Sequence, residues 1–147
     1  MIQRKQTIFL FIAVVFTVVA MSMQVATLLS NGIVVAKVYN LWLTDGQGQH
    51  AFQSAPLFVA LLLSALLSIV TIFMYMKRKL QSQLCLVNML LLVGWYVLLA
   101  VLPQYVGGEM HLEWPVVLPA ISIILQFMAR KGILADEKLV RSLDRIR

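Results

Sequence analysis

The residues best suited to chemistry lie in the segment GGEMHLEWP, where Glu109, His111 and Glu113 alternate. On an extended backbone, alternate side chains point to the same side, so the three would form one face. His50 and Asp45, from an earlier polar segment, could add two more ligands for a metal ion. The spacing matches no established metal-binding pattern and favours ordinary solvated residues. We therefore expect no metal and no other cofactor.

The long apolar runs of the chain argue against most membrane chemistry. They contain no Asp, Glu, Lys, Arg or His, whereas proton-coupled carriers and pumps normally place an ionisable group within the membrane. Haem needs axial ligands such as His, and disulfide exchange needs paired cysteines, but Cys85 is the only cysteine. Ser64 and Ser68 have no basic partner at their depth to activate a nucleophile. The sequence predicts a protein that is not an enzyme.

Polar side chains within the apolar runs are predicted to be buried packing groups. Asn88 lies ~6 Å and Gln126 ~5 Å inside the same end of their runs, at a rise of about 1.5 Å per residue. We expect these two amides to approach one another, with Thr71 nearby. Gln24 is predicted to serve the same purpose in the first run. The alternative is that the amides bind a small ligand or a lipid.

Composition requires membrane helices to carry these residues. The chain has 147 residues, of which 61% are hydrophobic and 12% are charged, whereas a soluble domain is roughly 45–50% apolar and about 25% charged. A spanning helix needs about 20 apolar residues, and only helices or closed barrels cross lipid. We expect an all-α four-transmembrane-helix bundle forming a single domain over residues 1–147. The predicted spans are residues 7–29, 56–76, 84–102 and 114–129.

Small and polar residues recur every three or four positions in three of these spans, which places them on one face of each helix. Such residues let helices approach closely in lipid, so we expect the three stripes to face one another. The stripes are Ala13, Thr17, Ala20, Gln24 and Thr27; Ala60, Ser64, Ser68 and Thr71; and Pro115, Pro119, Ser122, Gln126 and Ala129.

The outer loop, residues 30–55, predicts a small β-hairpin. The stretch IVVAKVYNLWLT is rich in β-branched and aromatic residues, DGQG supplies a turn, and a shorter strand returns around HAFQ.

Basic residues predict the orientation of the chain. All twelve lysines and arginines except Lys37 fall on one side of the predicted membrane, and such residues favour the cytoplasmic side. Both termini are therefore predicted to be cytoplasmic. The basic face predicts binding to anionic lipid headgroups or to a protein partner, not to nucleic acid. Its residues are Lys77, Arg78, Lys79, Lys138, Arg141 and Arg145.

The first span has an alternative interpretation. MIQRK followed by an apolar run resembles a secretory signal peptide, with VVA at residues 18–20 as a cleavage site. Apolar character continues to Leu29, beyond an ordinary signal peptide, and this favours an uncleaved anchor.

The tail, residues 132–147, predicts a separate amphipathic helix after a bend at Gly132. Asp136 is a credible N-cap, and Glu137 can pair with Arg141. The helix would serve either as an interfacial anchor or as a docking surface for a partner. Its apolar side consists of Leu139, Val140, Leu143 and Ile146.

Three segments resemble one family: MIQRKQT at the start, YMKRKLQSQLCLVN in the middle and DEKLVRSLDRIR at the end. It is an uncharacterised bacterial family of small four-helix inner-membrane proteins, known as a domain of unknown function. Lys5 departs from its pattern, in which an aliphatic residue often follows MIQR. The resemblance implies four spans in a bacterial cytoplasmic membrane, and it implies no activity.

These features together predict a non-enzymatic integral membrane protein. It would act as an accessory or assembly component, with a membrane protein, a cytoplasmic protein or further copies of itself as partner. The alternative is a carrier for a small ligand or a lipid that uses the membrane-buried amides.

Overall fold

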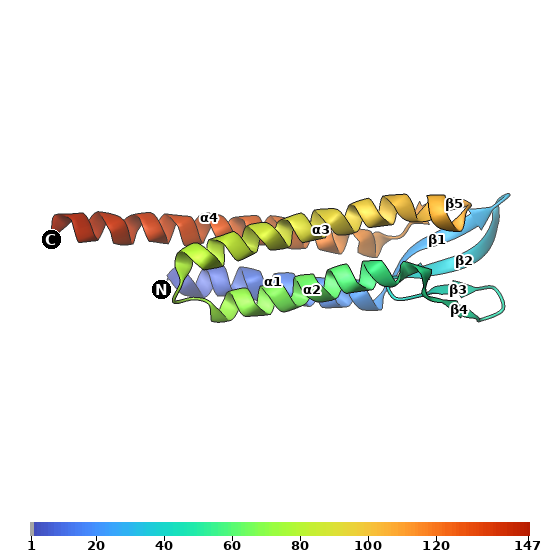
Figure 1. The fold of residues 1–147 in the computed structure, drawn as a ribbon, viewed down its shortest axis with the longest axis horizontal. Coiled ribbons are helices and arrows are strands. Elements are labelled where there is room, and N and C mark those ends of the chain that lie inside the picture. Colours follow the sequence, from blue (N-terminus) through green and yellow to red (C-terminus); the bar gives the residue numbers. More distant parts are fainter. Residues whose placement is uncertain (1) are drawn as a thin grey trace.

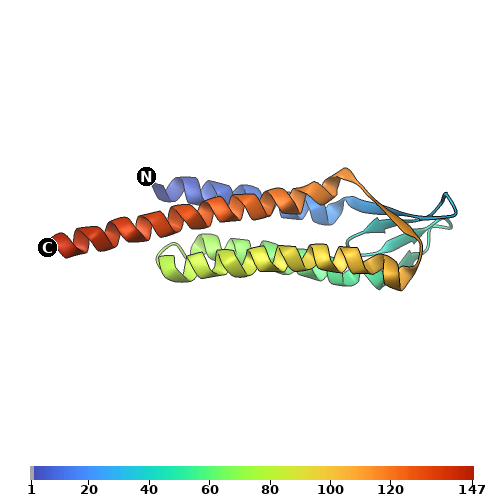
Figure 2. The ribbon, with the colours of Figure 1, turned by 90° about the horizontal axis from the view of Figure 1, so that it is seen from above.

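A computed structural model describes residues 2–147, with side chains from Lys5 onward. Four helices run side by side and a sheet lies at one end of them (Figure 1). α1 packs against α2 and α4, and α3 also packs against α2 and α4 (Figure 2). The helices are α1 (Ile2–Ser22), α2 (Ala55–Phe73), α3 (Arg78–Val106) and α4 (Val117–Ile146).

All four helices are long and apolar enough to cross a membrane. Large apolar side chains remain exposed along the outside of the bundle, among them Phe11, Leu63, Leu90 and Phe127. Exposure of so much apolar surface to water is unfavourable, whereas contact with lipid is not. The architecture is consistent with a multi-pass membrane protein.

The sheet corrects the predicted fold class, because it is larger than a small hairpin in an all-α protein. It is antiparallel and five-stranded, in the order β4-β3-β2-β1-β5. Two short 3-10 helices, Phe52–Ser54 and Trp114–Val116, lead from it into α2 and α4. The strands are β1 (Gln24–Ser30), β2 (Ile33–Tyr39), β3 (Leu43–Asp45), β4 (His50–Ala51) and β5 (Glu109–Leu112).

The predicted first span, residues 7–29, is wrong at its end, because α1 stops at Ser22 and the next residues form β1. The missed signal is the pair Asn31 and Gly32, with φ of 52° and 78°. Two positive φ values in succession suit a tight hairpin turn, and Asn-Gly is its preferred sequence. The turn pairs β1 with β2, while β5 pairs with the other edge of β1. A short apolar run fits a strand or a helix equally well.

The outer loop contains the predicted turn within a larger structure. The Gly48 amide donates to the Asp45 carbonyl at 2.8 Å, which closes the DGQG turn. The single long strand predicted before this turn is interrupted between Tyr39 and Leu43 and forms β2 and β3. β5 was not predicted, and it lies in the segment first considered for its polar residues.

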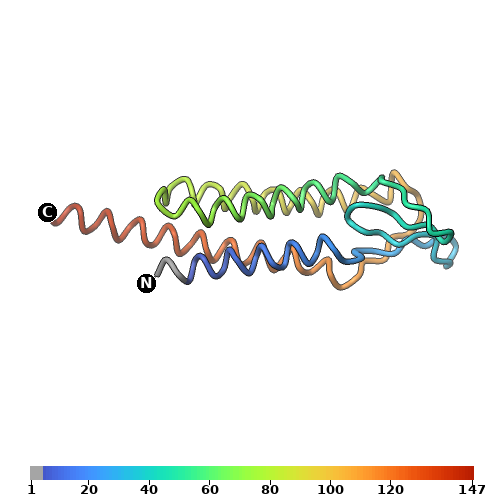
Figure 3. The backbone as a smooth tube through the Cα atoms, turned by 90° about the horizontal axis from the view of Figure 1, so that it is seen from below, coloured from blue at the N-terminus to red at the C-terminus, as the bar shows by residue number. Residues whose placement is uncertain are grey.

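The predicted bend at Gly132 is also wrong, because α4 continues through it to Ile146. A Cβ atom on Gly132 would lie 3.1 Å from Cγ of Gln6, so the glycine makes room for a side chain of α1. Gln6 Nε2 then donates to Asp136 Oδ2 at 2.7 Å within the interior. Asp136 is therefore a partner of α1 and not the N-cap of a separate helix. The end of α4 extends past the other three helices (Figure 3).

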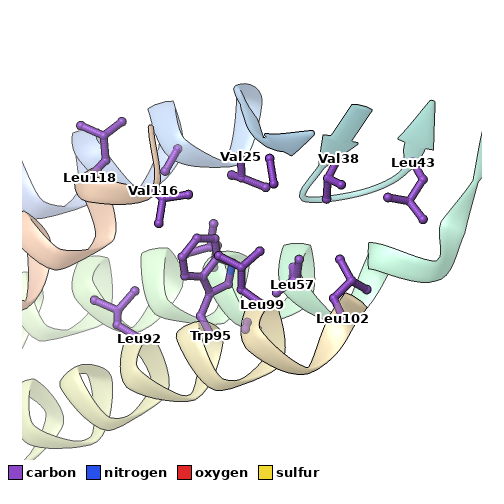
Figure 4. Packing of buried hydrophobic residues seen from close by; sticks show 14 of the residues in the cluster. Val25, Val38, Leu43, Leu57, Leu92, Trp95, Leu99, Leu102, Val116 and Leu118 are labelled. Carbon is purple, nitrogen blue, oxygen red and sulfur yellow. The ribbon is translucent and has the colours of Figure 1, made fainter. Parts of the chain in front are cut away.

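The largest apolar cluster joins the sheet to the helices (Figure 4). Val25, Val38 and Leu43 point from the strands toward Trp95 and Leu99 of α3, and all five are buried. An isolated hairpin is marginally stable in water. The sheet is stabilised by this shared core and forms one structure with the adjoining end of the bundle.

We predict that Gly132→Leu destabilises the bundle by about 1–3 kcal/mol, because the added side chain must displace Gln6 from Asp136. Gly94→Ala is the matched control, since nothing lies within 4 Å of its Cβ position. That control should leave stability unchanged or raise it by up to about 1 kcal/mol through helix propensity. Thermal unfolding of the purified protein in detergent measures both, and an equal effect of the two substitutions would contradict the packing role of Gly132.

Candidate functional site

The two predicted amides meet at one hydroxyl group in the interior of the bundle. Asn88 Nδ2 of α3 donates to Ser68 Oγ of α2 at 2.6 Å, and Gln126 Nε2 of α4 reaches the same oxygen at 3.4 Å. Asn88 also donates to the Ser64 carbonyl at 3.1 Å. We call Ser64, Ser68, Asn88 and Gln126 the polar centre. It joins three helices at one level.

Three atoms of the polar centre have no hydrogen-bond partner among the described residues: Ser64 Oγ, Asn88 Oδ1 and Gln126 Oε1. Asn88 is 1% exposed and Gln126 is 0% exposed. An external molecule could therefore reach these atoms only if the helices separated. The geometry favours interhelical packing over an open binding site.

Thr71 and Gln24 do not belong to the polar centre. The Thr71 hydroxyl donates to the Leu67 carbonyl within α2, and the Thr71 carbonyl accepts a hydrogen bond from Gln81 Nε2 at 3.1 Å. Gln24 lies at the start of β1, where its amide donates to Thr27 Oγ1 at 2.9 Å. The prediction that Gln24 is buried between membrane helices is wrong, because α1 has already ended.

The small-residue stripes of α1 and α4 face one another. Thr17 Oγ1 donates to the Ala13 carbonyl at 2.8 Å, and Ser122 Oγ donates to the same carbonyl at 3.2 Å. The two hydroxyls are 3.4 Å apart. Ala13, Thr17 and Ser122 are fully buried, so this part of the predicted helix packing is confirmed.

Asn40 is a structural residue that the sequence did not reveal. It follows β2, and its Nδ2 donates to the Ala20 carbonyl of α1 at 2.7 Å. Its Oδ1 accepts from Trp95 Nε1 of α3 at 3.0 Å, and its carbonyl accepts from the Phe58 amide of α2 at 3.2 Å. The Asn40 side chain thus connects the sheet to α1 and α3, and its backbone carbonyl connects it to α2. A polar residue within an otherwise apolar, aromatic stretch was the available signal.

The outer polar residues do not form one site. His50 lies on β4 and His111 on β5, which are the opposite edges of the sheet. Glu113 accepts a hydrogen bond from Thr27 Oγ1 at 2.9 Å. Over residues 2–147, no three His, Cys, Asp or Glu residues group closely enough to hold a metal ion.

Basic residues gather at the end of the bundle remote from the sheet. Lys77, Arg78 and Lys79 lie at the turn between α2 and α3. Lys138, Arg141 and Arg145 lie near the end of α4, and the predicted pair of Glu137 with Arg141 is confirmed at 2.7 Å. Lys79, Lys138 and Arg141 line one cleft between α3 and α4, and Arg145 lies outside it.

The four helices, long and apolar enough to cross a membrane, together with the small sheet are consistent with the class of multi-pass helical membrane proteins. Within this class the chain belongs to the family described as a domain of unknown function, DUF4293, whose model matches residues 2–146. The predicted resemblance to a family of unknown function is thereby confirmed. A comparison with curated proteins finds no match.

We predict that Ser68→Ala lowers stability by about 0.6–2 kcal/mol, because the Asn88 and Gln126 amides lose their shared acceptor. Ser142→Ala is the control, since the Ser142 hydroxyl is exposed and bonds only to the Leu139 carbonyl of its own helix. Thermal unfolding in detergent should separate the two variants. A Ser68→Ala protein as stable as the control would contradict the role of the polar centre in packing.

Proposed function

We propose that the chain crosses a bacterial cytoplasmic membrane four times with both termini in the cytoplasm. In support, both termini and the α2–α3 turn lie at one end of the bundle (Figure 1). Lys77, Arg78 and Lys79 lie at that end, whereas Lys37 lies on β2 at the other. Retention of lysine and arginine on the cytoplasmic side then places the sheet outside.

We further propose that the protein is a non-enzymatic accessory or assembly component that binds a second protein through the end of α4. The observation that carries this is the uncovered apolar face beyond Asp136. Leu143 is 64% and Ile146 is 81% exposed, on a segment that extends past the other helices (Figure 2). α4 is continuous to Ile146, and in the proposed orientation this face lies on the cytoplasmic side of the membrane. Burying one such side chain contributes about 1.5–3 kcal/mol.

Charge defines the surface that the partner would offer. Lys138, Arg141 and Arg145 flank the apolar face, and Glu137 already pairs with Arg141. An apolar helix or groove bordered by carboxylates complements this pattern. Anionic headgroups of the inner leaflet are a second partner of the same basic end.

The enclosed polar centre speaks against the alternative of a carrier. A carrier must expose its binding groups to at least one side, whereas Asn88 and Gln126 are buried and share Ser68. The geometry thus supports assembly better than transport.

Orientation is tested by labelling single cysteines in intact cells with a membrane-impermeant maleimide. In a Cys85→Ala background, Gly46→Cys places a thiol on the exposed β3–β4 turn, where a Cβ meets nothing within 4 Å. Leu143→Cys places one at the other end of the molecule. We expect labelling of the first variant only, and labelling of both after lysis. The reverse pattern in intact cells would overturn the proposed orientation.

Partner binding is tested with the same two variants and a bifunctional thiol–amine crosslinker in native membranes. We expect Leu143→Cys to give one discrete larger species, and Gly46→Cys to give none of that size. Adding Leu139→Asp should abolish the species by placing a carboxylate on the apolar face, while the melting temperature stays unchanged. A product of twice the chain mass would identify a second copy as partner. Equal crosslinking of both cysteines, or none at Leu143→Cys, would contradict the docking role of α4.

A further inference from the structure

The cleft between α3 and α4 is lined by an excess of positive charge. Its volume is about 470 Å³, and Lys79, Arg130, Lys138 and Arg141 contribute to its walls. Glu137 is the only carboxylate that lines it, and this group is engaged by Arg141 at 2.7 Å. Lys79, Arg130 and Lys138 then have no carboxylate left to balance their positive charge within the described lining. This excess positive charge would attract an anion.

The lining of the cleft includes hydrogen-bond donors. Arg130 is partly exposed and its Nε has no partner among the described residues, but because that atom is buried, a ligand would reach the exposed part of the side chain. Ser82 is 4% exposed and lines the same cleft. α3 begins at Arg78, one turn before Ser82, after a residue that provides no side-chain cap. The first turn of a helix carries a partial positive charge. Guanidinium, hydroxyl and ammonium groups together match the oxygens of a phosphate group.

Apolar side chains continue from the cleft toward the interior of the membrane. Leu86 follows Ser82 by one turn of α3, and Phe127 precedes Arg130 by one turn of α4. Both are exposed, and Leu134 lines the cleft itself. Residues three or four apart share a helix face, so a charged site is followed by a lipid-facing apolar surface. A ligand with a phosphate head and an acyl chain can contact both the charged site and the apolar surface. A soluble anion can contact only the charged site.

We propose that this cleft is a binding site for the phosphate of an anionic phospholipid of the inner leaflet. Arg130, Lys79 and Lys138 bind the phosphate, Ser82 donates a hydrogen bond to it, and the acyl chain lies over Leu86 and Phe127. The assignment of the leaflet rests on the proposed orientation. The site deepens the proposed lipid partnership by naming the residues and the chemical group. Basic residues outside the cleft, such as Arg145, are not part of the site.

The test compares two variants that lose the same charge. Lys79→Gln with Arg130→Gln removes two positive groups from the cleft, and Arg145→Gln with Arg147→Gln removes two from the end of α4 outside it. Each purified full-length protein is titrated with phosphatidylglycerol and with phosphatidylcholine, and bound lipid is counted by native mass spectrometry. We expect the unmodified protein to prefer phosphatidylglycerol. The cleft variant should lose about tenfold in affinity for phosphatidylglycerol, and the control less than about twofold.

Two further measurements keep the test decisive. If the Arg130→Gln variant is unstable by thermal unfolding, Lys79→Gln with Lys138→Gln replaces it, because both lysines are exposed and their loss should not disturb packing. Excess inorganic phosphate is added as a competitor, and it should displace little phosphatidylglycerol because it lacks the acyl chain. Equal losses in the cleft and control variants, equal binding of both lipids, or full displacement by inorganic phosphate would each overturn the site. Reversed cysteine labelling with selective lipid binding intact would instead overturn the orientation alone.

Discussion

A polar side chain buried between apolar helices is stabilised when it bonds to another part of the chain, because an unpaired polar group is costly there. This constraint determines how the helices are arranged. Ser68 accepts from Asn88 and Gln126 and thereby joins α2, α3 and α4. Ser122 and Thr17 share the Ala13 carbonyl and join α4 to α1. Rotation of any of these helices by one face would leave amides or hydroxyls toward lipid without partners. Apolar side chains alone would allow many arrangements of the four helices, and the hydrogen bonds between polar groups favour one of them.

The sheet is attached to the bundle by backbone pairing and by one buried residue. β1 follows α1 and is paired on both edges, with β2 and β5. Asn40 then connects the strands to α1, α2 and α3 through three hydrogen bonds. The edge strands are short, with two residues in β4 and four in β5. Short edges limit unwanted pairing with other chains. The sheet covers one end of the bundle without presenting a long free edge.

The depth of a polar residue along a continuous helix follows from its position in the sequence, because the rise per residue is constant. This rise predicts similar depths for Asn88 and Gln126, and in the structure both side chains reach Ser68. It gives a wrong position for Gln24, because α1 ends at Ser22 and an apolar strand continues the run. Gly132 illustrates a different limit. A glycine in a helix permits either a bend or a close contact, and the choice depends on Gln6, which is far away in sequence. Contacts between residues far apart in the chain produce no local sequence pattern from which they could be predicted.

Orientation in the membrane and binding of a ligand depend on different properties of the basic residues. Orientation depends on how many lysines and arginines remain on one side, and it is insensitive to where they sit around the helices. Arg145 and Arg147, at the free end of α4, would contribute to orientation as much as any other basic residue on that side. The convergence of Lys79, Arg130 and Lys138 on one cleft is more specific than orientation requires. Placing like charges together costs energy through mutual repulsion. An anion held between them would offset that repulsion, and this is why the arrangement, more than the charge itself, indicates a ligand.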